Sequence, residues 1–119
     1  MTLRPLVLVS LLSLASSAGF ASDLALTLPP GEAILISSSE QAKPKSYAST
    51  TELCKSFSAW LSTNRSGWSR YLATMPSQGM HVQAGELRFQ FNKDSVIVRT
   101  KNGLFQKHIE PKTYTFLTQ

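Results

Sequence analysis

One thiol and two imidazoles are the side chains of this sequence best suited to nucleophilic or metal chemistry. Cys54 is the single cysteine, and His81 and His108 are the two histidines. A histidine can activate a thiol as a nucleophile, and histidines that converge with a carboxylate such as Glu86 or Glu110 can hold a metal ion. These side chains fall on separate predicted elements, and their spacing gives no reason for them to meet.

The thiol itself is expected to be unreactive. Cys54 falls on the apolar side of a predicted helix, where a cysteine behaves as a small buried hydrophobic residue. The sequence also lacks the glycine-rich phosphate-binding motifs, the zinc-protease helix motif and the Gly-x-Ser-x-Gly elbow. No predicted element carries two acidic residues spaced for acid–base catalysis. We therefore expect no catalytic residue, no metal and no cofactor, and a small Cys- or His-dependent enzyme is the last of three hypotheses.

The first 21 residues have the pattern of a secretory signal peptide. Arg4 is followed by the apolar run Leu6 to Ala15 and by Gly19-Phe20-Ala21, with small residues at the first and third positions. The run is shorter than the roughly 20 residues that a membrane-spanning helix needs. We expect cleavage after Ala21, with a cut after Ala18 as the alternative. This leaves a single mature domain of residues 22–119 with no stable membrane span, and it predicts a periplasmic or secreted location.

Residues 79–118 alternate apolar and polar side chains, which predicts an antiparallel β-meander. Asn102-Gly103 is typical of a two-residue type I′ turn, and an earlier turn is expected around Lys93-Asp94. The predicted pairs are Phe91–Val96, Phe89–Val98, Arg88–Arg99, Thr100–Phe105, Val98–Lys107 and Val96–Ile109. Both turns place the apolar residues on one face, with a fourth strand near Lys112 to Thr118.

The middle of the chain, residues 49–74, is predicted to be helical. Ser49 and Glu52 form a capping box, which predicts a helix from about Thr50 to Thr63. Trp68 to Thr74 is expected to add a further turn or two. Residues at helical spacing form one apolar stripe: Leu53, Cys54, Phe57, Trp60 and Leu61.

The preceding region, residues 22–48, is predicted to hold strands and a polar loop. Leu24 to Leu28 and Glu32 to Ser37 have strand character, and Ser37 to Ser46 is polar. The expected fold is α+β: a small antiparallel meander of four or five strands, with one amphipathic helix packed on its apolar face.

The second face of the meander is basic, with two apolar residues among the charges. Its candidate binding residues are Arg88, Ile97, Arg99, Lys101, Leu104 and His108. Such a face attracts anionic partners, although an ordinary solvated strand face has the same composition. The aromatic residues lie mostly on the other face, so the stacking platform of a single-stranded nucleic-acid binder is missing.

The first hypothesis is therefore an exported, non-enzymatic binding or accessory module that recognises a protein or an anionic component of the cell envelope through this basic face. The second is an inhibitor or immunity-type protein of an exported enzyme, with Ser37 to Ser46 or Asn64 to Gly67 as the contact loop. The sequence does not predict the oligomeric state.

Overall fold

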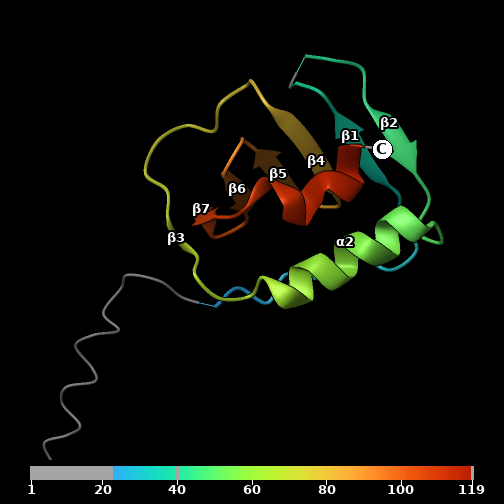
Figure 1. Cartoon of the computed structure of the whole chain (residues 1–119), viewed down its shortest axis with the longest axis horizontal. Coiled ribbons are helices and arrows are strands. Elements are labelled where there is room, and N and C mark those ends of the chain that lie inside the picture. The colour runs from blue at the N-terminus through green and yellow to red at the C-terminus, as the bar shows by residue number, and fades with distance from the viewer. Residues whose placement is uncertain (1–22, 40, 119) are drawn as a thin grey trace, which may run out of the picture.

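An antiparallel sheet of seven strands forms the centre of the computed structural model, which describes residues 23–39 and 41–118 (Figure 1). The predicted signal peptide lies outside the described residues. The spatial order is β2-β1-β4-β5-β6-β7-β3. The strands are β1 (Ile34–Ser37), β2 (Lys45–Tyr47), β3 (Ser69–Arg70), β4 (Met80–Ala84), β5 (Leu87–Phe91), β6 (Ser95–Thr100) and β7 (Gly103–His108).

The α+β class and the antiparallel sheet are confirmed, but the expected number of strands was too low. The additional strands are the two edges of the sheet, β2 and β3, with three and two residues. β2 overlaps the end of the predicted polar loop, and β3 lies where a helical turn was expected. Both are too short to leave a pattern in the sequence, and short edge strands limit pairing with other chains.

The register between β5 and β6 agrees with the prediction. Phe91 opposes Val96, Phe89 opposes Val98 and Arg88 opposes Arg99. The apolar members of these pairs lie on one face of the sheet, and Phe89, Phe91, Val96 and Val98 are buried there.

The register between β6 and β7 differs from the prediction by two residues. Lys101 and Asn102 form the turn, so Thr100 opposes Gly103 and Val98 opposes Phe105. The Thr100 hydroxyl stabilises this turn, because it accepts from the Asn102 amide at 3.0 Å and lies 3.2 Å from the Gly103 carbonyl. A shift of two positions keeps every side chain on its predicted face, since successive side chains alternate between faces.

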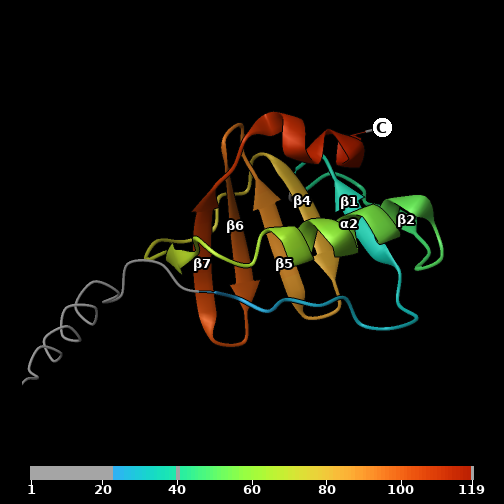
Figure 2. The same cartoon turned by 60° about the horizontal axis from the view of Figure 1, so that its bottom comes forward.

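One helix, α2 (Glu52–Thr63), crosses the apolar face of the sheet (Figure 2). Four residues of the predicted stripe are buried, and Leu53 packs against them at the edge. The helix begins two residues later than predicted. Its N-cap is Thr51, whose side chain accepts from the Cys54 amide at 3.3 Å, and not Ser49.

The C-terminal segment is helical, which corrects the prediction of a fourth meander strand. Residues Pro111–Thr118 form η1, which consists of 3-10 helical turns on either side of a kink at Tyr114 (φ −126°, ψ 19°). η1 contacts α2 on the same side of the sheet (Figure 1). Pro111 starts this helix favourably because its ring fixes φ near the helical value. The Tyr114 hydroxyl donates to the Asn92 and Lys93 carbonyls, so η1 is tied to the β5–β6 turn.

The N-terminal segment, residues 23–33, is extended but forms no strand, contrary to the prediction for Leu24 to Leu28. It runs across the sheet beside α2 (Figure 2). Leu24, Leu26 and Leu28 are half-buried against the core. Among the described residues, none of the helices has the length and hydrophobicity of a membrane-spanning segment.

The second face of the sheet is crossed by residues 71–79, which connect β3 at one edge to β4. This segment is tied to the face at several points. The Tyr71 amide donates to the Leu104 carbonyl at 2.9 Å, which extends the β3–β7 pairing at the sheet edge. Over the face itself, His81 Nε2 lies 3.2 Å from the Ser77 carbonyl, and the Gln90 side chain donates to the Gln78 carbonyl at 2.6 Å. Ile97, one of the candidate binding residues, is buried: it neighbours Gln90 in the covered row and is only 3% exposed.

Candidate functional site

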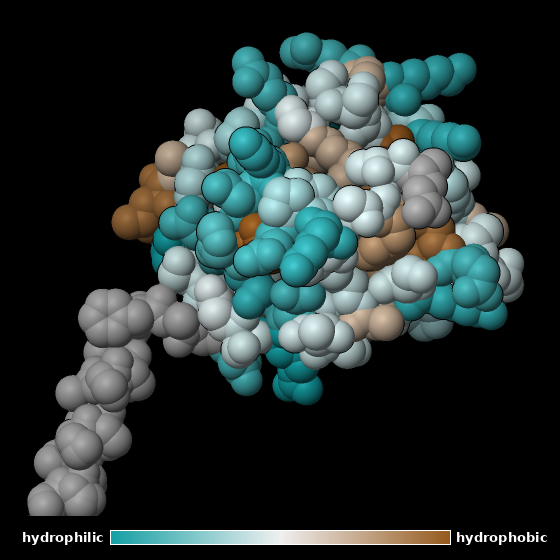
Figure 3. Space-filling model, in the orientation of Figure 1, coloured by the Kyte–Doolittle hydropathy of each residue, from teal (hydrophilic) through white to brown (hydrophobic). Residues whose placement is uncertain are grey.

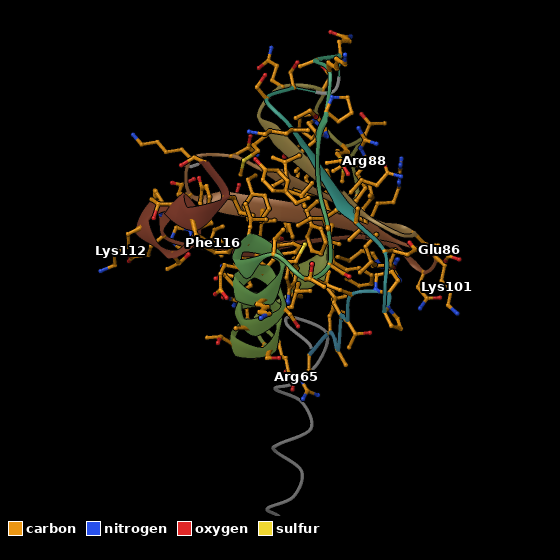
Figure 4. All side chains as sticks on the ribbon, turned by 90° about the vertical axis from the view of Figure 1, so that its right-hand side faces the viewer. Arg65, Glu86, Arg88, Lys101, Lys112 and Phe116 are labelled. Carbon is orange, nitrogen blue, oxygen red and sulfur yellow. The ribbon has the colours of Figure 1, made fainter. Side chains whose placement is uncertain are left out.

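Three of the six predicted site residues lie together on the second face. Arg88 on β5 opposes Arg99 on β6, and Arg99 opposes Leu104 on β7. These three residues form one row across three adjacent strands. Arg88 projects on the side of the sheet opposite to Phe116 of η1 (Figure 4).

The other three predicted residues do not join this row. Ile97 belongs to the neighbouring, covered row. Lys101 is exposed in the β6–β7 turn, and His108 is exposed at the other end of β7, opposite Ser95. The candidate site is therefore smaller than the basic face that the sequence suggested.

Arg88 is held in place by two neutral acceptors on β4. Its Nε donates to His81 Nδ1 at 3.4 Å, and its Nη1 donates to Gln83 Oε1 at 3.2 Å. His81 is 3% exposed, and its Nε2 lies 3.2 Å from the Ser77 carbonyl. Since Nδ1 accepts from Arg88, the consistent tautomer carries its proton on Nε2 and donates it to Ser77. Arg88 is thus oriented without any neutralisation of its charge.

Arg99 is exposed, and no carboxylate lies within ion-pair distance of Arg99 or Arg88 among the residues that the structure describes. The ion pairs found in that part of the chain are Glu52–Lys55 and Glu110–Lys112. Like charges directly opposite one another across a strand pair are destabilising. The row therefore presents two positive charges that the described residues leave uncompensated.

A cleft of about 320 Å³ lies between this row and residues 71–79, which cross the second face and are called the crossing segment below. Its charged and polar side is formed by His81, Arg88 and Arg99. The remaining wall is mostly apolar and comes from two places, residues 73–76 of the crossing segment and Leu104. A smaller hollow of about 140 Å³ lies on the far side of Arg88 and His81, against β1 and residues 42–44. Arg88 therefore faces open space on both sides.

The crossing segment is anchored by a buried amide network. Gln90 is fully buried, and its Nε2 donates to the Gln78 carbonyl and to Asn92 Oδ1, while its Oε1 accepts from Asn92 Nδ2. Gly79 allows the close approach: its φ is +81°, and a Cβ there would lie 2.7 Å from both Gln90 Nε2 and the Phe91 carbonyl. The wall of the cleft is fixed to the sheet at this end.

The structure does not bring Cys54 together with a histidine. Cys54 is buried on α2, where its Sγ lies 3.5 Å from the Tyr47 carbonyl. His81 points to the opposite face of the sheet, beside Gln90. In the described ranges, no three side chains of the metal-binding types are grouped closely enough to hold an ion.

A wider hollow, of about 950 Å³, lies between the N-terminal segment and the end of the sheet formed by the β4–β5 and β6–β7 turns. Its walls are largely apolar and include Leu26 and Leu87. Its rim carries both signs of charge, because Glu86 and Lys101 project to the same side (Figure 4). The charged residues of this rim are of both signs, whereas those that line the cleft beside Arg88 are the two arginines.

Sequence reasoning missed His81 and the crossing segment as parts of the site. A signal for His81 was present: a tight turn at Gly85-Glu86 places Gln83 opposite Arg88, as observed, and strand alternation then puts His81 on the same face. No comparable signal exists for residues 73–76, because their position depends on where the distant strands β3 and β4 lie in the sheet.

No protein-family model matches the chain, and searches of curated proteins and of solved structures give no significant match.

Proposed function

We propose that this protein is a binding module that captures an anionic group in the cleft between Arg88, Arg99 and residues 73–76. The observation that carries the proposal is the opposed Arg88–Arg99 pair, which the described residues leave without a carboxylate. The predicted signal peptide supports action outside the cytoplasm, in the periplasm or as a secreted protein.

The pair suits an anion with several oxygen acceptors, such as a phosphate or sulfate group. Cα atoms of directly opposed residues lie only about 5 Å apart, so both guanidiniums can reach one anion. A guanidinium offers several donors in a planar fork that matches the oxygens of such groups. Arg88 commits Nε and Nη1 to β4, which leaves Nη2 for a ligand.

Preorganisation supports the same conclusion. The bonds to His81 and Gln83 limit the rotamers of Arg88 before a ligand arrives, which lowers the entropy cost of binding. The apolar wall formed by Met75, Pro76 and Leu104 favours an anionic group that is attached to an apolar body over a fully hydrated ion.

The test is a titration of the protein with inorganic phosphate, followed through backbone amide chemical shifts. We expect saturable shifts at Arg88, Arg99 and residues 73–76. Arg99→Gln should weaken binding by about tenfold, in line with the loss of one charge-assisted contact of roughly 1.5 kcal/mol.

The matched control is Lys112→Gln, which also removes one positive charge, at a side chain that is 83% exposed and outside the cleft. This variant should bind phosphate as the wild type does. Equal losses in the control and in Arg99→Gln would show nonspecific attraction, and a wild type with no saturable shifts would refute the proposed site.

A further inference from the structure

We propose that the anionic group is the phosphate of an anionic phospholipid in a bilayer surface, and that Leu72 enters the membrane interface beside the cleft. This inference rests on the proposed anion site and names the source of its ligand. It describes peripheral attachment, in which a short apolar contact and nearby basic groups act together.

Leu72 is the first observation that supports it. Its exposed fraction is 90%, and it is the exposed large hydrophobic residue of the described structure. In Figure 3 apolar atoms protrude at the left edge of the molecule, where Figure 1 places the segment between β3 and β4. A single exposed leucine is ordinary on a soluble protein. Leu72 supports membrane contact only because basic side chains lie near it.

That position is close to the arginine pair. The Tyr71 amide is bonded to the Leu104 carbonyl, and Leu104 opposes Arg99. Tyr71 therefore lies two strand spacings, or about 10 Å, from Arg99. Leu72 is the next residue along the chain. Ala73, the next residue, lines the cleft together with Arg88 and Arg99. The apolar tip and the cationic cleft thus belong to one continuous surface.

The charge pattern of the chain is the second observation. Residues 64–85, which follow α2, contain no Asp or Glu, although they include Arg65 and Arg70. The crossing segment, residues 71–79, carries no formal charge at all. An anionic lipid surface would meet no carboxylate from this part of the chain, and each basic group near such a surface adds roughly a fivefold gain in affinity.

The test is flotation of the isolated protein, with its N-terminus defined by mass spectrometry, on two kinds of vesicle. One kind is pure phosphatidylcholine, and the other contains equal parts of phosphatidylcholine and phosphatidylglycerol. The wild type should float with the second kind. Arg88→Gln/Arg99→Gln should weaken binding by about 25-fold, and Leu72→Ser should weaken it by about tenfold because the apolar side chain is lost.

Two variants serve as controls. Leu72→Trp keeps a large apolar side chain suited to the interface and should bind at least as well as the wild type. Lys55→Gln/Lys112→Gln carries the same net charge as the double arginine variant and should stay within about twofold of the wild type, because its changes lie outside the cleft.

The outcomes separate this inference from the proposed function. Phosphate binding without flotation on anionic vesicles would overturn the inference and leave the anion site intact, with a phosphorylated or acidic protein as the next partner to test. Flotation unaffected by Leu72→Ser, or weakened equally by the lysine control, would also overturn it. Failure of both phosphate and vesicle binding would overturn the proposed function as well.

Discussion

Arg88 and Arg99 oppose each other on β5 and β6, and Arg88 is hydrogen-bonded to His81 on β4. The two arginines differ in their surroundings, since Arg88 is half-buried and Arg99 is exposed. Opposed like charges cost stability in a sheet. Proteins tend to break a local stability rule of this kind at functional sites, which agrees with the proposed anion site.

Removing the exposed member of this pair should not destabilise the fold. We expect Arg99→Gln to raise the free energy of unfolding by about 0.2–0.5 kcal/mol, because it relieves the repulsion across the strand pair. Arg88→Gln should be neutral or mildly destabilising, because it also loses the bonds to His81 and Gln83. Urea denaturation measures both values, and a loss of more than about 1 kcal/mol in Arg99→Gln would be inconsistent with an uncompensated pair.

The buried amide network should dominate the stability of the cleft wall. Gln90→Leu removes every hydrogen bond of the Gln90 side chain and leaves the Gln78 carbonyl without this donor, so we expect a loss of about 2 kcal/mol. Amide hydrogen exchange in residues 77–79 should also become faster. The control is Gln106→Leu, which lies in the same row beyond Ile97 and is half-buried. A similar loss in both variants would mean that the network has no special role.

The first turn of α2 offers a direct test of which residue caps the helix. Thr51→Ala should lower the free energy of unfolding by about 1 kcal/mol, since it removes the acceptor for the Cys54 amide. Ser49→Ala should change it by less than about 0.5 kcal/mol, as expected for a substitution away from a specific interaction. Thermal and urea denaturation of the two variants measure these changes. A larger loss of stability in Ser49→Ala than in Thr51→Ala would show that Ser49 is the N-cap.

Tyr114 predicts how stability depends on alkaline pH. Burial raises the pKa of Tyr114 above its usual 10.0, and the nearby Asp94 carboxylate raises this pKa further. The unfolded chain therefore releases this proton at lower pH than the folded chain. The resulting stability is fully present below pH 10.0 and is lost as pH rises through the higher folded pKa.

Tyr114→Phe should remove this contribution along with the hydrogen bonds to the Asn92 and Lys93 carbonyls. We expect it to be about 1 kcal/mol less stable than the wild type at neutral pH. The difference between the two proteins should shrink above pH 10.0, as measured by urea denaturation at several pH values. A difference that stays constant with pH would contradict the linkage to this hydroxyl.

Local sequence patterns predicted the hairpins, because a short turn between two adjacent strands sets how they pair. The pairing of Arg88 with Arg99 followed from a short turn between two alternating strands, and it is confirmed. The Asn102-Gly103 prediction placed the hairpin correctly but its turn one residue too late. The Thr100 hydroxyl bonds and the contact of Arg70 Nη1 with the Asn102 carbonyl at 3.0 Å stabilise the earlier position.

The errors fall where distant segments meet. Strand alternation assigned Ile97 to the second face but could not predict its burial, because residues 71–79 cover that face only after β3 pairs with the edge of β7. Residues 112–118 have strand-like composition, yet they follow Pro111 into η1 and pack against α2. Pairing and burial of this kind depend on tertiary contacts that override local preference.

The most direct measurement of the central claim is the response of the arginine side chains themselves to phosphate. Their Nε–H resonances can be followed in one titration, with Arg65 and Arg70 as internal controls, because neither lines the cleft. The account predicts that Arg88 and Arg99 shift along the same saturation curve while Arg65 and Arg70 do not. Four arginines that shift together without saturation, or an unperturbed Arg88–Arg99 pair, would contradict it.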